Sequence, residues 1–351
     1  MELTVEFAAP SDDAAIRALL RRQPMPGRIQ IAFHREPDFS LGCAVTGDDY
    51  RIVVARAPEE IVGVACRSAR RVFINGREQR IGYLGQLRVD ERFQGRWLVA
   101  RGFSLLKKID GEDPLPAYLA SIVDGNDDAT GVLVRKRRAS FPSFHEVAPY
   151  RTLAISVKKR HVEDSEDIMA GSADQISEIV EFLRNDGSRR QLFPVWTEES
   201  LRNLAAFGLP TENIRIARRG GAIVGVTALW DQSAYKQAIV RGYSGWMKAV
   251  SWMLPRVGDE VRSAYAALIC VANDDTAVFA RLLREVYNLA AARGFDYLLV
   301  GLDARDPLLP VARAYSHFLY PSRLYLASWS NGGHLYEQLD QRPVYVDIAT
   351  L

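Results

Sequence analysis

Hydrophobic and polar residues alternate along the chain in blocks that predict strands interleaved with helices. Residues 83–89 are predicted to form a strand, in which Leu87 and Val89 lie two positions apart and therefore share one face. A polar turn containing Gly95 follows, and residues 100–108 have the spacing of a helix. A glycine-containing turn between a strand and a helix leaves free backbone N–H groups at the helix start. These groups suit a phosphate or a pyrophosphate.

Features of the first half of the chain recur in the second half at offsets of 161 and 162 residues. The predicted helix 14–22 recurs as 175–184, and the predicted hairpin 54–64 recurs as 216–226. Two matches in the same order and at almost the same offset indicate two copies of one domain. The polar junction 158–167 then predicts a linker between a first domain, 1–157, and a second domain, 168–351.

The second copy also contains a strand, a turn and a helix, predicted over 264–271 and 276–293, but its turn holds no glycine. Asp274 and Asp275 stand in this turn, and two carboxylates repel an anion at close range. The second copy is therefore predicted not to bind a phosphate-bearing ligand, and its turn residues serve as ordinary helix caps.

Composition limits the class of protein. The 351 residues suggest about two domains, and 48% hydrophobic with 25% charged residues is ordinary for a soluble globular chain. No apolar run is long enough for a membrane span. The three cysteines and five histidines are scattered, which predicts no metal site and a reducing, cytoplasmic location.

Charge divides unevenly between the halves. Residues 1–160 carry 26 Lys and Arg against 20 Asp and Glu, whereas the remainder carries 19 against 23. A basic first half favours a ligand with several phosphates. An isoelectric point near 8.4 is too mild to argue for a nucleic-acid partner, and the oligomeric state stays open.

The segment from Leu87 to Val99 resembles the acetyl-CoA site of the GNAT N-acetyltransferase superfamily. In that family a strand with the pattern L-x-V leads into a pyrophosphate loop written Q/R-x-x-G-x-G/A. Gln94 matches the first position of the loop, and Trp97 and Val99 stand where the family has glycine or alanine. Backbone N–H donors survive both substitutions, so Trp97 is expected to direct its indole away from the loop.

The resemblance implies an α/β fold of the α+β kind, with two GNAT-like domains, each a mixed, mostly antiparallel central sheet flanked by helices. It implies that the first domain binds acetyl-CoA and transfers the acyl group to an amine acceptor, which the sequence does not identify. Asn126 would lie near the pantetheine, or would act simply as a helix cap. The residues that the resemblance assigns to coenzyme binding are Leu87, Arg88, Val89, Gln94, Gly95, Arg96, Trp97, Leu98, Val99 and Asn126.

Catalytic groups are less evident. The place of the tyrosine acid that many relatives use falls on Leu133, which cannot donate a proton. Tyr83 and Gln86 remain on the central strand as candidates to orient a water, and a backbone N–H near Val89 could stabilise an oxyanion. The run 343–348 is predicted to be a strand, so the Leu351 carboxylate could approach the site, as a terminal carboxylate does in some two-copy relatives.

Two other interpretations stay open. The chain could be a non-catalytic pair of GNAT-like domains that binds a coenzyme or a partner, which Trp97, Val99 and Leu133 favour. It could also be an aminoacyl transferase that uses charged transfer RNA, against which the mild charge argues.

Overall fold

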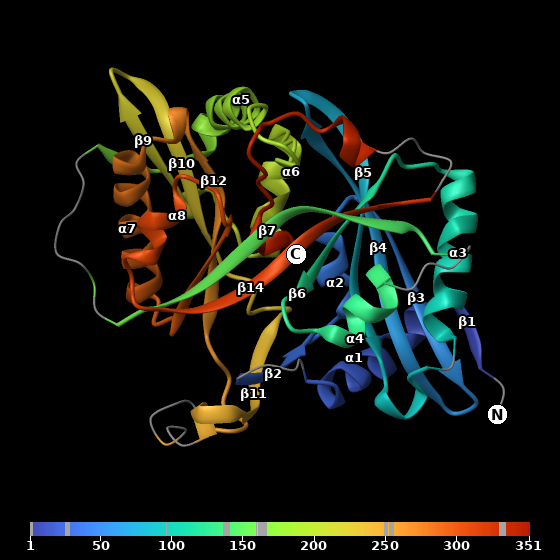
Figure 1. The fold of residues 1–351 in the computed structure, drawn as a ribbon. Helices are drawn as coiled ribbons and strands as arrows, with labels where there is room; N and C mark the ends of the chain where they lie inside the picture. The colour runs from blue at the N-terminus through green and yellow to red at the C-terminus, as the bar shows by residue number, and fades with distance from the viewer. Residues whose placement is uncertain are drawn as a thin grey trace.

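The computed structural model describes residues 3–24, 29–95, 97–135, 141–158, 160, 167–248, 252, 256–329 and 335–351. Within them the chain forms a twelve-stranded sheet and a small two-stranded sheet, with helices packed against the large sheet (Figure 1). This is the mixed, mostly antiparallel α/β fold that the sequence predicted. Arg96, one of the predicted coenzyme-binding residues, lies outside the described residues.

The strand order of the large sheet mirrors itself about the centre: β1-β3-β4-β5-β6-β14-β7-β13-β12-β10-β9-β8. Inward from either edge, four antiparallel strands come first, and the fifth strand is parallel to the fourth. The strands are β1 (Thr4–Phe7), β3 (Asp49–Ala57), β4 (Glu60–Ile74), β5 (Arg77–Val89), β6 (Tyr118–Val123), β7 (Ser143–Ser156), β8 (Ile168–Ala170), β9 (Ile214–Arg219), β10 (Ala222–Trp230), β12 (Ser263–Val271), β13 (Tyr297–Asp303) and β14 (His317–Ser328).

At the centre of the sheet, two long strands, β7 and β14, each lie next to strands from the other half of the chain. β14 lies between β6 and β7, and β7 lies between β14 and β13. In Figure 1 they cross the middle of the molecule together, and they pair along their length, from Ile155 with His317 to Ser143 with Ser328. β7, which precedes the predicted linker, is therefore hydrogen-bonded on both edges to strands that follow the linker, β13 and β14.

The small sheet joins segments that are about 200 residues apart in the sequence. β2 (Ile29–His34) pairs antiparallel with β11 (Gln237–Tyr243), and His34 lies opposite Gln237. It lies beneath the large sheet in Figure 1. Arg35 and Lys236 are the residues next to His34 and Gln237 in the sequence.

The four longest of the described helices, α1, α3, α5 and α7, cover the large sheet because each presents an apolar stripe to it. α7, for example, buries Val278, Leu282 and Val286 completely against β9, β10 and β12. No helix among the described residues is long and apolar enough to cross a membrane. The helices are α1 (Asp13–Arg22), α2 (Phe39–Ala44), α3 (Leu98–Glu112), α4 (Asp127–Ala129), α5 (Ile176–Gly187), α6 (Glu198–Asn203), α7 (Thr276–Ala292) and α8 (Leu309–Arg313).

Most predicted local elements are confirmed, including both hairpins and the helices at 14–22, 100–108, 175–184 and 276–293. The predicted strand at 343–348 is wrong. This segment makes a single bridge, from Val344 to Gln191, and then turns in a short 3-10 helix, Ile348–Thr350. Its side chains at 344–347 are buried, and two of them, Tyr345 and Asp347, accept hydrogen bonds from backbone amides of β12.

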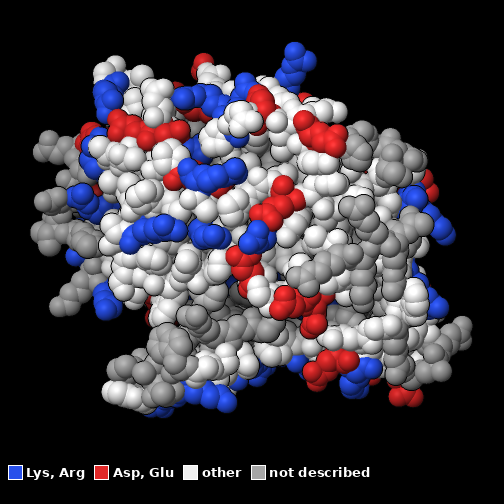
Figure 2. Space-filling view, viewed as in Figure 1, with Lys and Arg blue, Asp and Glu red and all other residues white. Residues whose placement is uncertain are grey.

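Charged side chains do not gather by sign on the face shown in Figure 2. Among its described residues, Lys and Arg are interspersed with Asp and Glu. This view therefore shows no extended basic surface of the kind that binds a nucleic-acid backbone.

Candidate functional site

A large cavity opens where β5 and β6 separate. The two parallel strands pair at Gly82 with Tyr118 and at Tyr83 with Leu119, and within the described ranges no further pairing joins them. Beyond these pairs the strands diverge, and a cavity of about 1200 Å³ lies beside them. α3, the small sheet and strands from the C-terminal half of the chain supply its other walls. Its lining is mainly apolar, as is usual for a small-molecule site.

A β-bulge bends β5 at the wall of this cavity. Gln86 and Leu87 together oppose the single residue Ala65 on β4, and Gln86 has a φ of +58°. A bulge leaves a backbone group outside the ladder, and both bulge residues line the cavity. Farther along, Asp90 N donates to Val62 O at 2.8 Å, so the alternate amide of Val89 points to the open edge of the strand. This edge can therefore donate hydrogen bonds to a carbonyl or amide ligand.

The N-terminus of α3 meets the same cavity. The helix begins at Leu98, and its N-cap residue Trp97 has a φ of +64° and makes no side-chain cap. The first N–H groups of a helix have no partner within the helix, so those of α3 are available to an anion. Trp97 is 64% exposed whereas Leu98 is 5% exposed, so the indole points outward, as the sequence required.

The structure brings together most, but not all, of the predicted coenzyme-binding residues. Those that line the cavity are Leu87, Arg88, Val89, Leu98, Val99 and Asn126. Gln94, Gly95 and Trp97 are exposed and do not belong to its described lining. Asn126 also accepts a hydrogen bond from Ala129 N at 3.0 Å, so it caps α4 and lines the cavity at once.

Tyr83 and Gln86, the predicted catalytic residues, both line the cavity. Burial raises the pKa of Tyr83 far above its usual value, so its hydroxyl stays protonated and is a donor. The side-chain oxygen of Gln86 accepts a hydrogen bond from Arg35 at 3.0 Å. Asp90, in the following turn, is paired with Arg92, which lowers the pKa of Asp90, and it is a structural cap rather than a base.

Two cavity residues were not identified from the sequence, Arg35 and Lys236. Arg35 directly follows β2 and Lys236 directly precedes β11, so both stand beside the ends of the paired strands. Arg35 lies between a histidine and a glutamate, and Lys236 lies between a tyrosine and a glutamine, so neither is set apart by its neighbours in the sequence. Nothing in the sequence reveals that both residues line one cavity.

The C-terminal half of the chain has a matching pair of parallel strands, but its wedge is filled. β12 carries a bulge at Leu268, with a φ of +54°, as β5 does at Gln86. Here Asp347 accepts a hydrogen bond from Leu268 N at 2.8 Å, and the hydroxyl of Tyr345 accepts one from Ile269 N at 2.9 Å. The C-terminal segment therefore occupies the place that is open beside β5.

The helix that follows β12 is also closed to an anion. Asp275 accepts hydrogen bonds from Ala277 N and Val278 N at the start of α7, at 3.0 and 3.1 Å. A carboxylate thus already holds these donors, whereas the start of α3 has no side-chain cap. Of the two carboxylates predicted to repel an anion, Asp275 has this capping role, whereas Asp274 forms an ion pair with Arg190.

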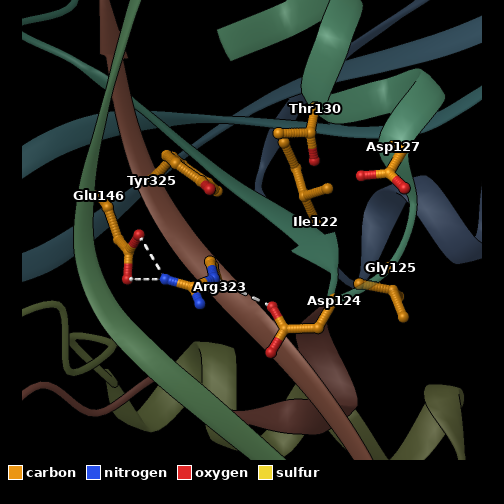
Figure 3. Close-up of a pocket in the computed structure, with 9 residues that line it drawn as sticks. Ile122, Asp124, Gly125, Asp127, Thr130, Glu146, Arg323 and Tyr325 are labelled. Carbon is orange, nitrogen blue, oxygen red and sulfur yellow. Dashed lines mark hydrogen bonds and ion pairs between the residues drawn. The ribbon is translucent and has the colours of Figure 1, made fainter. Parts of the chain in front are cut away.

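A smaller hollow of about 460 Å³ adjoins the main cavity (Figure 3). Arg323 lies across it and donates to Glu146 at 2.9 Å and to Asp124 at 3.1 Å, as the dashed lines show. Its cation is thus neutralised by the protein itself. The ion pairs of this hollow hold β14, β7 and the end of β6 together, and they leave Arg323, the one cation of its described lining, unavailable to an anionic ligand.

The splayed parallel strands, the bulge and the following helix define the class of the fold, which is GNAT-like. No family model and no curated protein matches the sequence. Solved structures with this fold do match. N-myristoyltransferase of Saccharomyces cerevisiae with bound myristoyl-CoA has a TM-score of 0.63 at 10% identity, covering 93% of this chain and 79% of that chain.

A GCN5-related glucosamine N-acetyltransferase region of a fungal multi-domain β-N-acetylglucosaminidase is also similar. Its TM-score is 0.64 at 15% identity, and the match covers 93% of this chain and 38% of that chain. At such low identities these likenesses concern the fold, which agrees with the fold class predicted from the sequence.

Proposed function

We propose that the protein is an acyl-CoA-dependent N-acyltransferase whose N-terminal half binds acetyl-CoA and whose acceptor is an amine. The observation that carries this proposal is the open wedge between β5 and β6, with a bulge in one wall and an uncapped helix start beside it. The similar N-myristoyltransferase structure holds myristoyl-CoA, and the other similar protein is an N-acetyltransferase region, which supports the same chemistry.

In this proposal the wedge holds the pantetheine along the open edge of β5, beside Leu87, Arg88 and Val89. The N–H groups at the start of α3, at Leu98 and Val99, bind the pyrophosphate. Gln94, Gly95 and Trp97 belong to the approach to this helix, and Asn126 closes the opposite wall. The bulge at Gln86 and Leu87 offers its amide to the thioester carbonyl.

The transfer itself needs few protein groups. The neutral amine attacks the carbonyl carbon, the C–S bond breaks, and the amine proton passes through water while the thiol is released. Tyr83 stays protonated and is a donor, so we assign to Tyr83 and Gln86 the orientation of this water rather than proton abstraction.

The second half of the chain, 168–351, is proposed as a second GNAT-like domain that binds no coenzyme and shapes the acceptor side of the cavity. The mirrored strand order supports two related halves, 1–157 and 168–351, joined at 158–167. The filled wedge beside β12 and the capped start of α7 support a single coenzyme site. The three cysteines are free and buried, which supports a reducing, cytoplasmic location.

The size of the cavity favours a second candidate, in which the acyl chain is longer than acetyl. A volume of about 1200 Å³ with a mainly apolar lining, including Phe103 and Leu106 of α3, has room for a chain beyond the thioester. Comparing acetyl-CoA with acyl-CoAs of increasing chain length in one assay decides between the two.

Two glycines of α3 provide the test of the coenzyme site. Gly102 lines the cavity and Gly111 does not, and an added Cβ would meet nothing within 4 Å at either position. Gly102→Leu is expected to fill the wedge and weaken acetyl-CoA binding at least tenfold in calorimetry, whereas Gly111→Leu leaves it unchanged. Both changes favour the helix, so loss of folding does not explain a difference. Equal affinity in both variants contradicts the site.

Calorimetry and an amine-dependent assay of thiol release separate the alternatives. Coenzyme binding without release of thiol to any amine favours a non-catalytic binding protein. Transfer from an aminoacyl-tRNA, with no coenzyme binding, favours the aminoacyl transferase.

A further inference from the structure

Three cations converge on one end of the cavity. Arg35 follows β2, Lys236 precedes β11, and Arg88 lies on β5, directly after the bulge. Arg35 is only 4% exposed. Arg35 and Lys236 flank the same aromatic ring, since the guanidinium carbon of Arg35 lies 5.8 Å and the ammonium of Lys236 lies 5.9 Å from the ring centre of Phe33.

None of these cations has an acidic partner among the described residues. Arg35 Nη2 donates to Gln86, but its Nη1 is buried without a hydrogen-bond partner. Arg88 Nη1 donates to the carbonyl of Leu87 at 2.7 Å. The ammonium of Lys236 lies 4.7 Å from the ring centre of Tyr265. The contrast with the adjoining hollow is direct, because Arg323 there is neutralised by two carboxylates.

Unpaired cations in a desolvated place oppose folding, since burial penalises the charged form and like charges repel. Burial lowers the pKa of Arg35, and it lowers the pKa of Lys236 well below its usual value, with the charge of Arg35 acting in the same direction. The same two causes lower the pKa of Arg88 to about 10. A bound anion would relieve both penalties, as is typical of groups kept for binding rather than stability.

The position of the cluster specifies which part of a ligand it meets. Arg35 is bonded to Gln86, which belongs to the bulge assigned to the thioester carbonyl. The start of α3, assigned to the coenzyme pyrophosphate, is a separate wall of the cavity. An anion held by Arg35 and Lys236 therefore lies next to the reacting carbonyl, on the side formed by the C-terminal half of the chain.

We propose that the acceptor is an amine that carries a carboxylate, such as a free amino acid, and that Arg35 and Lys236 bind this carboxylate with Arg88 beside them. This inference rests on the proposed acyltransferase function. A carboxylate on the acyl chain has the same chemistry, so the experiment includes an arm for it.

The test measures thiol release from acetyl-CoA with paired acceptors of matched shape, for example phenylalanine and phenethylamine, and expresses kcat/KM per neutral amine because the two amines differ in pKa. The carboxylated member of each pair is expected to have at least a tenfold higher kcat/KM. The preference is expected to fall to about one in Lys236→Met and Arg35→Gln. Arg241→Gln, which removes an exposed cation from β11, the strand that Lys236 precedes, is expected to keep the full preference. Melting curves confirm that each variant is folded.

Equal kcat/KM within the matched pairs of the wild-type protein would overturn the inference and leave the proposed function intact. So would a carboxylate preference that survives both variants. In the other arm, a preference for succinyl-CoA over acetyl-CoA with neutral amines assigns the anion to the acyl chain and overturns the acceptor assignment. Failure to bind acetyl-CoA in calorimetry is a different result, because it refutes the acyltransferase itself.

Discussion

Substituting Asp347 tests whether the C-terminal segment is the plug that closes the wedge beside β12. The carboxylate is 1% exposed and accepts hydrogen bonds from Leu268 N at 2.8 Å and from Ala349 N at 3.0 Å. Hydrogen bonds to a charged group contribute about 1.5–3 kcal/mol each, and their loss leaves buried donors unsatisfied. Burial raises the pKa of Asp347, which offsets part of this gain. We expect Asp347→Ala to lower the free energy of unfolding by about 2–4 kcal/mol.

Tyr345→Phe removes from the same network a single hydroxyl, which also donates to Asp347 at 3.5 Å. It removes the oxygen that accepts from Ile269 N and leaves that buried amide without its partner, so a loss of about 1–3 kcal/mol is expected. Urea unfolding followed by tryptophan fluorescence measures both variants. Glu337→Gln, at an exposed carboxylate of the C-terminal region, is the control and is expected to change stability by less than about 0.5 kcal/mol.

The reasoning fails if Asp347→Ala is no more destabilising than the control. A separate refutation comes from ligand binding. Tyr345→Phe is expected to leave the affinity for acetyl-CoA unchanged, because Tyr345 lies beside β12 rather than β5. A large loss of affinity would show that the filled and open wedges have been assigned the wrong way round.

Three other variants extend the test. Trp97→Gly is expected to keep acetyl-CoA affinity and to change stability by between zero and a gain of about 1 kcal/mol, since glycine adopts a φ of +64° without strain; a clear loss in urea unfolding contradicts this. Lys236→Met is expected to raise stability by about 1 kcal/mol at pH 7. Burial lowers the pKa of Lys236 in the folded protein, whereas in the unfolded chain it is about 10.4. The wild-type protein is therefore least stable at and below the folded-state pKa, and its stability rises with pH between the two values, because the unfolded chain then binds more protons. The advantage of the variant should therefore shrink between pH 7 and 9.5, and a constant advantage refutes the assignment. Tyr83→Phe is expected to lower kcat about ten- to a hundred-fold, with a rate that still follows the pKa of the acceptor amine; an unchanged kcat removes Tyr83 from the reaction.

Many of the strands and helices could be predicted from patterns of neighbouring residues in the sequence. The hairpin at 54–64 and its repeat at 216–226 follow from alternating apolar residues around short turns, and the structure places both as predicted. Gly220 and Gly221 both have positive φ, as a tight turn of this kind requires. The strand, turn and helix between Tyr83 and Glu112 were also evident, because each depends on residues close together in the sequence.

Other features depend on partners that are far apart. The bulge at Gln86 places a non-glycine residue at positive φ, and the strain is tolerated because β4 and the cavity walls hold it. The run 343–348 alternates like a strand, yet within the described residues its ladder is limited to the bridge between Val344 and Gln191. Its side chains instead meet the amides of Leu268 and Ile269.

The periodicity and the glycine-containing turn between β5 and α3 were thus enough to predict most of the elements, and the family resemblance of residues 87–99 implied the fold class. Only the folded chain could reveal the pairing of β7 with β14, the plug beside β12, and the meeting of Arg35 with Lys236 across about 200 residues. The physical reason is the sequence separation over which each kind of interaction acts. Periodicity and turn chemistry act between neighbours in the sequence, whereas burial, register and unpaired charge arise only when distant segments are packed together.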